Sequence, residues 1–189
     1  MALSENALVA MEDIKAVLSI QDDKNDGIIE ALVEGVSAEI VRYCDRPLRE
    51  AAYTAVKLDG SGQNDLQLPA WPITAGPSDV SVDGEALTLD TDYASYAETG
   101  VLRLLSGSAW GAGIQNIIAT WTAGYTLASM PGDIRMAAII QVAHEYQVFL
   151  NRAWGITNKG ISGQNISFES EGLLKRVKDL VAPYRRRGL

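Results

Sequence analysis

The apolar residues of the first 44 positions recur with the spacing of two helices. We expect a short helix over 11–18, then a polar break in which Asp22 or Asp26 caps a long second helix over 27–44. Pro47 ends that second helix, because a proline disfavours helical backbone in the residue before it. The apolar face of the short helix consists of Met11, Ile14 and Leu18. The stripe of the long helix consists of Ile28, Ile29, Leu32, Val33, Val36, Ile40, Tyr43 and Cys44.

The middle of the chain changes to the two-residue period of strands. Residues 52–73 predict a strand, a glycine-rich turn and a second strand. An Asp83-Gly84 pair between alternating apolar residues is typical of a hairpin. Two further strands are expected over 100–105 and 116–125. Together these patterns predict a small antiparallel sheet or barrel between helical parts.

A second long helix is expected over 131–154. Pro131 suits a first helical turn, and Asp133 lies near the positive end of the helix dipole. The stripe consists of Ile139, Val142, Ala143, Tyr146, Phe149 and Leu150. Ala137, Ala138 and Ile140 widen it until the first half is apolar almost all round. Such a helix is buried on several sides, and we expect a neighbouring subunit to supply part of the cover.

The last third of the chain predicts a loop, a helix and a basic tail. Residues 155–170 are polar and glycine-rich and predict a mobile loop. A final amphipathic helix ends at Pro183 and leads into the tail "YRRRGL". The fold class expected from the whole pattern is α+β, mainly α: a helical bundle with a small antiparallel β insertion. We expect one domain over 1–189, made of N-terminal helices (1–50), a β-rich insertion (51–125), a long helix (126–154), a flexible loop (155–170) and a C-terminal helix with the tail (171–189).

The charge and composition exclude some classes of protein. The formal net charge is −8, which argues against a general nucleic-acid binder, because such proteins need a basic surface to displace counterions. An acidic wall that surrounds DNA without gripping it remains compatible with this charge. The chain has a single cysteine, so it forms no internal disulfide. It lacks the pattern of a signal peptide and any continuous apolar run of membrane-spanning length.

The motifs that resemble chemical sites are incomplete. Residues 22–27, "DDKNDG", resemble a calcium loop, but Lys24 and Val33 fall where such a loop needs oxygen ligands. His144 is the only histidine, and Val148 stands where a zinc motif needs a second one. Cys44 has no second cysteine with which to bind a metal. We therefore expect no catalytic residues, no metal and no cofactor.

Three stretches of the chain resemble one known family. They are the long helix ending in "VRYCDRPL" (41–48), the central sheet with "LQLPAWPI" (66–73) and "VSVDGEAL" (80–87), and the strand-to-helix passage "TWTAGYTLASMPGDIRMAAIIQVAHEY" (120–146). In this order they resemble the head–tail connector, or adaptor, proteins of long-tailed bacteriophages and prophages.

The resemblance implies a structural protein without an active site. Such proteins form a ring, commonly of twelve copies, under the portal of a DNA-filled capsid. The ring extends the DNA channel toward the stopper and tail, and DNA passes through without sequence-specific binding. The implied partners are further copies of the chain, the portal protein and the stopper. The implied location is the head–tail interface of the virion, and the bacterial cytoplasm during assembly.

We predict two sets of contact residues from the stripes and the basic tail. The candidates for contacts between subunits are Val36, Ile40, Ile139, Ile140, Tyr146 and Phe149. The candidates for docking to the portal are Leu173, Leu174, Val177, Leu180, Tyr184, Arg185, Arg186 and Arg187. Two alternatives stay open: a monomeric module that presents the sheet to a protein partner, and a small enzyme with an unrecognised site, for instance among Asp90, Asp92 and Glu98.

Overall fold

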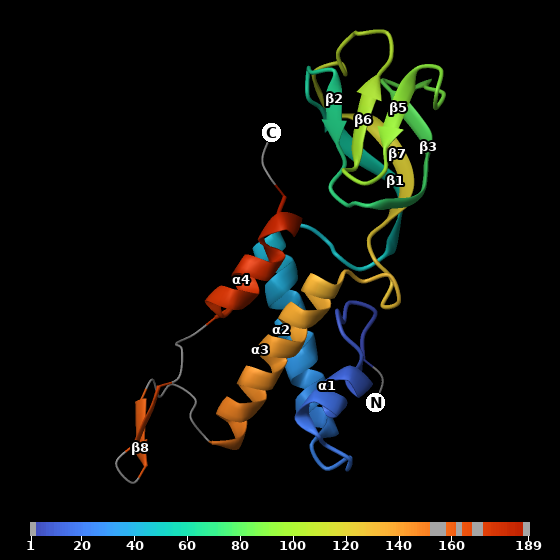
Figure 1. The fold of residues 1–189 in the computed structure, drawn as a ribbon. Coiled ribbons are helices and arrows are strands. Elements are labelled where there is room, and N and C mark those ends of the chain that lie inside the picture. The colour runs from blue at the N-terminus through green and yellow to red at the C-terminus, as the bar shows by residue number, and fades with distance from the viewer. Residues whose placement is uncertain (1–2, 152–157, 162–163, 168–171, 187–189) are drawn as a thin grey trace. The chain divides into compact units, whose positions relative to one another are not determined.

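The computed structural model describes residues 3–151, 158–161, 164–167 and 172–186, and the chain divides into two compact units (Figure 1). Met1–Arg46 and Leu127–Leu189 make up the first, which we call the helical unit. Pro47–Thr126 make up the second, the β unit. The β unit is therefore an insertion between two helices of the helical unit.

The described part of the helical unit contains four α-helices and one short 3₁₀ helix. They are α1 (Met11–Leu18), α2 (Asp26–Cys44), α3 (Gly132–Leu150), α4 (Lys175–Val181) and η1 (Ala182–Tyr184). The helices predicted over 11–18 and 27–44 are confirmed as α1 and α2. The helix predicted over 131–154 is confirmed as α3, although it ends at Leu150, where the Asn151 N–H donates to the Gln147 carbonyl. Residues 152–154 lie outside the described part.

The predicted cap of α2 is wrong, and a lysine gives the reason. Asn25 precedes α2 without a side-chain cap, and Asp26 already lies in the first helical turn. Lys15 Nζ lies 2.8 Å from Asp23 Oδ1 and 2.9 Å from Asp26 Oδ1. The carboxylates of the calcium-like segment thus bind the ammonium group of α1 and tie α1 to the start of α2.

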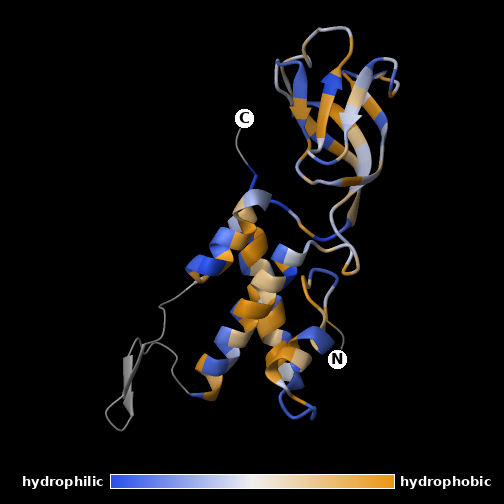
Figure 2. Cartoon of the chain, viewed as in Figure 1, coloured by the Kyte–Doolittle hydropathy of each residue, from blue (hydrophilic) through white to orange (hydrophobic). Residues whose placement is uncertain are grey.

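Helix α3 is the central helix of this unit. It packs against α1, α2 and α4, and its buried side chains point in several directions. Figure 2 shows apolar residues where α2 and α3 face each other and hydrophilic ones on the outer side of α4. Helices of the same chain therefore cover much of the apolar surface of α3, although Met136 and Leu150 stay 48% and 51% exposed. None of the described helices is long and apolar enough to cross a membrane.

The segment before α1 also belongs to the core. Ala7, Leu8 and Val9 are at most 1% exposed, and the Leu8 N–H donates to Ser37 Oγ of α2 at 3.1 Å. Ser4 donates through its backbone N–H and its hydroxyl to the carboxylate of Glu34. These contacts order a stretch in which no regular element was predicted.

The β unit consists of two antiparallel sheets. The strands are β1 (Ala51–Gly60), β2 (Asp65–Gln67), β3 (Ile73–Val82), β4 (Glu85–Ala86), β5 (Tyr93–Tyr96), β6 (Val101–Leu104) and β7 (Gly113–Ala123). The order is β1-β7-β3-β4 in one sheet and β2-β6-β5 in the other. The hairpin predicted at Asp83-Gly84 is confirmed as β3–β4, and both turn residues have positive φ, as such a turn requires.

The inner faces of both sheets share one core. Leu66 and Leu102 from the small sheet meet Ile117, Ala119 and Trp121 from the large one. The Tyr53 ring stacks on Trp121 with 4.8 Å between the ring centres. This core explains the alternation along β7, in which every second residue from Ile117 to Ala123 is buried.

Gly124 lies at the end of the β unit, next to the residues with which that unit begins. Its φ is +111°, and a Cβ at this position would lie 2.4 Å from the Arg49 carbonyl oxygen. The next residue, Tyr125, donates its N–H to Leu48 and accepts the N–H of Glu50. The backbone therefore turns at Gly124, at the end of β7, and the chain beyond it lies beside the residues that lead into β1.

Two further strands lie between α3 and α4. They are β8 (Asn158–Ile161) and β9 (Gln164–Ser167), which pair as an antiparallel hairpin. The flexible loop predicted over 155–170 therefore contains strands. The remainder of that predicted loop, and Arg187 of the predicted tail, lie outside the described residues.

The predicted fold class, mainly α, is wrong in the proportion of helix to strand. The chain is not mainly a helical bundle with a small insertion, because the β unit has seven strands in two sheets and a core of its own. Strands occupy about as many described residues as helices do. The sequence pattern shows each strand only as a short separate segment. The large sheet forms when distant segments such as β1 and β7 pair, and this pairing is not visible in the local pattern.

Candidate assembly surfaces

The position of α4 is fixed at its start by a buried amide. Gln141 of α3 is fully buried, and its Oε1 accepts the Leu174 N–H at 3.0 Å. Its Nε2 donates to Glu145 Oε1 at 2.9 Å and to the Gly172 carbonyl at 3.3 Å. Leu174 is the residue before α4, so Gln141 satisfies a backbone group that the helix itself leaves free.

The other end of α4 is attached to the end of α2. The Arg186 N–H donates to the Cys44 carbonyl at 2.8 Å, and Arg46 Nε donates to the Tyr184 carbonyl at 2.6 Å. The Arg185 guanidinium lies 5.0 Å from the centre of the Tyr43 ring. Burial raises the pKa of the Cys44 thiol to about 11, which keeps it protonated. The end of the described chain is thus a structural part of the helical unit.

These attachments determine which predicted portal-docking residues can reach a partner. Leu173 and Val177 are buried against the other helices. Arg185 and Arg186 are exposed, and the remaining described candidates, Leu174, Leu180 and Tyr184, are partly exposed. The apolar stripe of α4 therefore holds the helical unit together, and the surface that remains is mostly polar and basic.

The predicted subunit-contact residues divide in the same way. Val36, Ile40 and Tyr146 are at most 4% exposed, and the hydroxyl of Tyr146 accepts a hydrogen bond from Asn25 at 2.9 Å. These three side chains belong to the core of their own unit. Ile139, Ile140 and Phe149 are partly exposed, so they remain the candidates that another copy could touch.

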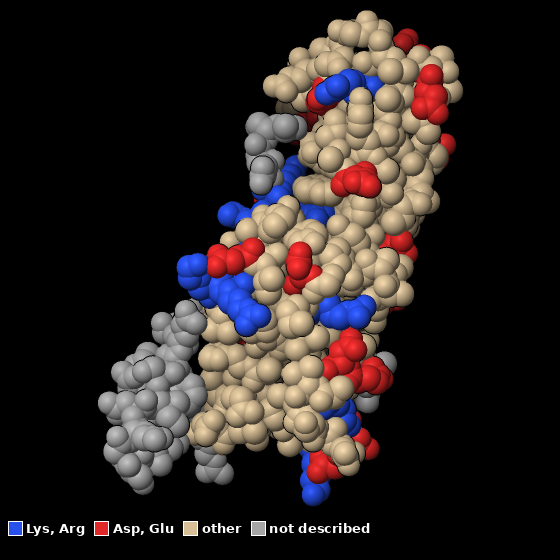
Figure 3. All heavy atoms as spheres, viewed as in Figure 1, with Lys and Arg blue, Asp and Glu red and all other residues tan. Residues whose placement is uncertain are grey.

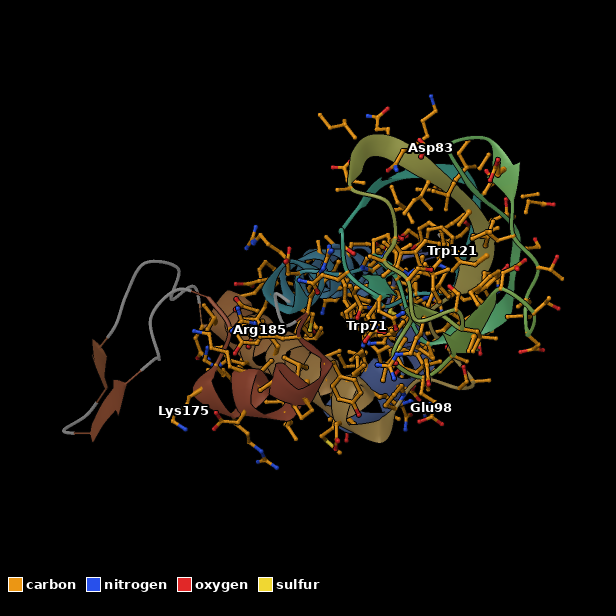
Figure 4. All side chains as sticks on the ribbon, turned by 90° about the horizontal axis from the view of Figure 1, so that it is seen from above. Trp71, Asp83, Glu98, Trp121, Lys175 and Arg185 are labelled. Carbon is orange, nitrogen blue, oxygen red and sulfur yellow. The ribbon has the colours of Figure 1, made fainter. Side chains whose placement is uncertain are left out.

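The outer side of α4 carries a basic face. We use this name for Lys175, Arg176 and Lys178 of α4 together with Arg42 of α2. Figure 3 shows Lys and Arg gathered over α4, and in Figure 4 Lys175 projects away from the helices while Arg185 lies on a different side of α4. The side chains of Lys175 and Arg42 are 82% and 80% exposed. This face offers cations to a partner and is separate from the end of η1.

The β unit carries most of the negative charge of the chain. It contains nine Asp or Glu against three Lys or Arg, hence six of the chain's eight net negative charges. Residues 58–102 contain no lysine, arginine or histidine. The two units therefore differ strongly in charge, although the chain as a whole is merely acidic.

Carboxylates lie in and beside a groove of the β unit: Asp92 lines it, and Asp83, Glu85 and Asp90 lie within two residues of lining positions along the chain. Val82, Leu87, Leu104 and Trp110 line it, together with Asp92. Asp83 lies at the turn that continues from Val82, and Figure 4 shows it at the rim of the strands, away from the inward-facing Trp121. Leu105 also lines the groove and is 51% exposed. We call the groove with Asp83, Glu85, Asp90 and Asp92 the acidic groove.

Of the three residues proposed for a small enzyme, Asp92 has a structural partner and the other two are exposed. Asp92 Oδ2 accepts the Thr88 N–H at 2.7 Å and holds a turn, and Asp90 and Glu98 are exposed. Burial, with the charges of Asp90 and Asp79, raises the pKa of Tyr93. Among the described residues, no group of three or more His, Cys, Asp or Glu side chains could hold a metal ion. Asp90 and Asp92 therefore contribute negative charge around the groove rather than an evident catalytic set.

A comparison with family models decides what kind of protein carries these surfaces. Residues 7–187 match the model of the head completion protein family. The chain belongs to the head completion protein family. The match includes both units and the attachment of α4, and it confirms the family resemblance seen in the sequence. A member of this family is a structural protein of the phage head–tail connection.

Solved structures of similar fold come from a phage-like particle. One is described as the neck of an empty GTA particle computed with C6 symmetry, at 16% identity and a TM-score of 0.56. Another is the neck of a native GTA particle computed with C12 symmetry, at 14% and 0.53. A third belongs to the virion of a native gene transfer agent (GTA) particle, at 16% and 0.53. Each match covers 100% of this head completion protein and 94% of the other chain. Curated protein sequences gave no match.

Two features of this head completion protein were missed from the sequence. Gln141 lies within an apolar stretch of α3, and that position was the available signal that a polar side chain is buried for a purpose. The absence of basic residues over 58–102 was also visible, but the net charge of the whole chain hid it. Both features concern surfaces and attachments rather than catalysis.

Proposed function

We propose that this head completion protein forms a ring, of twelve copies, that joins the portal of the DNA-filled capsid to the stopper and tail. In this role it extends the DNA channel and carries out no chemical reaction. The observation that carries the proposal is the family match over residues 7–187. The neck structures of similar fold, solved with C6 and C12 symmetry, support the ring and its number of copies.

The acidic balance of the chain fits passage of DNA through such a ring. A surface with a net charge of −8 repels phosphates and does not hold the duplex in place. The protein would act at the head–tail interface of the virion, after assembly in the bacterial cytoplasm. Its partners would be other copies of the chain, the portal protein and the stopper.

The end of the described chain is the proposed contact with the portal. Leu180, Tyr184, Arg185 and Arg186 are the candidates there that the fold leaves at least partly exposed. Removing the C-terminal segment is a poor test of this contact, because Val177 and Val181 of α4 are fully buried and their loss would damage the helical unit. Substitution of exposed residues tests the contact without opening the core.

The ring function is tested with DNA-filled heads that lack this protein. Addition of the purified protein should restore joining to tails, and electron microscopy of the heads should show a twelve-fold ring at the portal vertex. Heads that join tails equally well without the protein would overturn the function. A ring of another number of copies would overturn the stoichiometry alone.

The portal contact is tested with Arg185→Glu/Arg186→Glu. Binding to portal-bearing heads should fall about tenfold or more, because two cations become anions at the contact. The matched control is Lys24→Glu/Lys57→Glu, which makes the same change in net charge at two exposed positions elsewhere. Equal binding by the arginine variant and the control would overturn this assignment.

A further inference from the structure

The basic face on the outer side of α4 has cations that its own unit does not neutralise. Lys175 Nζ pairs with Asp179 Oδ2 at 2.7 Å, and Arg42 lies 3.9 Å from Glu39 Oε1. Arg176 and Lys178 make no ion pair within the described part of the chain. Both are exposed, so two positive charges without an ion pair in the described residues face solvent beside the paired Lys175 and Arg42.

Most carboxylates of the acidic groove also lack an ion-pair partner among the described residues. In the β unit, among residues that the structure describes, Asp65 is paired with Arg103. Asp83, Glu85 and Asp90 are exposed and make no ion pair within the same described set. The exposed Leu105 and the apolar lining of the groove add a surface that water solvates poorly.

We infer that the basic face of one copy binds the acidic groove of the next copy around the ring. This inference rests on the proposed ring function and adds the surfaces that make the contact between copies. Two different patches of the same chain then meet, which is the head-to-tail contact that closes a cyclic ring. Complementary charge at such a contact steers association and disfavours wrong registers.

A second copy fits these surfaces better than DNA does. A DNA-binding surface needs several phosphate contacts, but two of the four cations of the basic face are paired within the chain, and the chain carries a net charge of −8. The copies of a ring also supply the partner at the required stoichiometry, with one acidic groove for each basic face. The long stems of lysine and arginine can cover apolar lining such as that beside Leu105 while their charges reach the rim.

Charge reversal and charge exchange test the contact in assembled necks. The basic-face variant is Arg176→Glu/Lys178→Glu. The groove variant is Asp83→Asn/Glu85→Lys, in which Asn is chosen because Asp83 has a φ of +51° that asparagine tolerates. Each should lower the number of copies retained on portal-bearing heads about tenfold. A chain with all four substitutions should regain part of the loss, because Glu85→Lys supplies a cation opposite the two introduced carboxylates while Asp90 and Asp92 keep their negative charges.

The control for these variants is again Lys24→Glu/Lys57→Glu, which should retain the wild-type number of copies. Failure of the wild-type protein to bind heads would count against the proposed function itself. Wild-type binding with unchanged binding of both charge variants would overturn only the contact between copies. Loss of binding in the basic-face variant without recovery in the exchanged chain, together with reduced retention of duplex DNA, would assign the face to DNA instead.

A crosslink gives an independent measurement of the same contact. Lys178→Cys and Glu85→Cys in one chain should give covalent ladders of two or more copies on heads when a short bismaleimide is added. Cys44 is buried with a raised pKa and should not contribute, so the chain with Cys44 alone is the control. A crosslinked product with the mass of a single copy, or no product from heads that carry the protein, would overturn the inference.

Discussion

The amide of Gln141 accepts the backbone N–H of Leu174 at 3.0 Å, so one buried side chain of α3 holds the residue from which α4 begins. The same amide donates to Gly172 and to Glu145. All surfaces of α4 discussed above depend on this attachment, because α4 has only seven residues and would not form a stable helix in isolation.

Replacement of Gln141 by leucine should therefore loosen α4. Leucine has a similar volume but leaves the Leu174 N–H and the Gly172 carbonyl without a partner, so the free energy of unfolding should fall by about 2 kcal/mol. Hydrogen exchange should become faster in α4 before it does so in α2. The control is Gln147→Leu on the exposed side of the same helix, expected to change stability by about 0.5 kcal/mol or less. Equal effects at the two positions would contradict this role.

Replacement of Gly124 by alanine should destabilise the β unit. The φ of +111° and a carbonyl oxygen 2.4 Å from the added Cβ both oppose a side chain here, and the expected cost is about 3 kcal/mol. Chemical denaturation measures it. Gly35→Ala in α2 is the matched control: no atom lies within 4 Å of its added Cβ, and the change should stabilise the chain by about 0.5–1 kcal/mol. A neutral Gly124→Ala variant would mean that the junction is not constrained.

The Asp65–Arg103 pair should make stability depend on acidity. The Arg103 guanidinium donates to both carboxylate oxygens at 2.6 and 2.7 Å, and this lowers the pKa of Asp65 below 3.8. A lowered folded-state pKa stabilises the fold at pH values above the unfolded-state pKa, and the effect is lost as the pH falls through the folded-state value. The difference in unfolding free energy between wild type and Asp65→Asn should therefore be constant from pH 7 to pH 5 and shrink below pH 3.8.

Urea denaturation at pH 7, 5 and 3 measures that dependence. Glu85→Gln provides the control, since Glu85 is exposed and makes no ion pair with any residue that the structure describes. High salt at pH 7 should also reduce the Asp65→Asn difference, because the pair is partly exposed to solvent. A difference that persists unchanged at pH 3 would show that packing, not charge, accounts for the effect.

Cys44 should be chemically silent in the folded protein. Its side chain is fully buried, and a pKa of about 11 leaves about one thiolate per thousand thiols at pH 8. A chromogenic disulfide reagent should react slowly in buffer and quickly in urea. Ala38→Cys, at an exposed position of the same helix, should react quickly in both. Fast labelling of Cys44 in buffer would indicate that α4 opens readily, because Val181 of α4 lies beside the thiol.

The sequence predicted the helices better than the sheets, for a physical reason. The period of α1 and α2 is written in consecutive residues, whereas β1 pairs with β7 across about sixty positions. The hairpin at Asp83-Gly84 was predictable because its pairing is local. The apolar residues around α3 correctly predicted that this helix is buried on several sides. The pattern did not show that α1 and α4, from distant segments of the same chain, supply part of that burial.

The contact surfaces were less predictable than the fold. The apolar stripe of the predicted C-terminal helix gave Leu173 and Val177 as docking residues, although such a stripe also occurs in a helix that packs on its own unit. The exposure of the side chains distinguishes a docking helix from a packed one, and exposure depends on the tertiary structure. The family, in contrast, followed from the order of short motifs, which sequence preserves directly.

The hydrogen bonds that join Tyr125 to Leu48 and Glu50 place the two ends of the β unit side by side. An inserted segment whose ends already touch can be exchanged for another without moving the residues that flank it. A different β unit could therefore take this place in the chain while α2, α3 and α4 kept their packing.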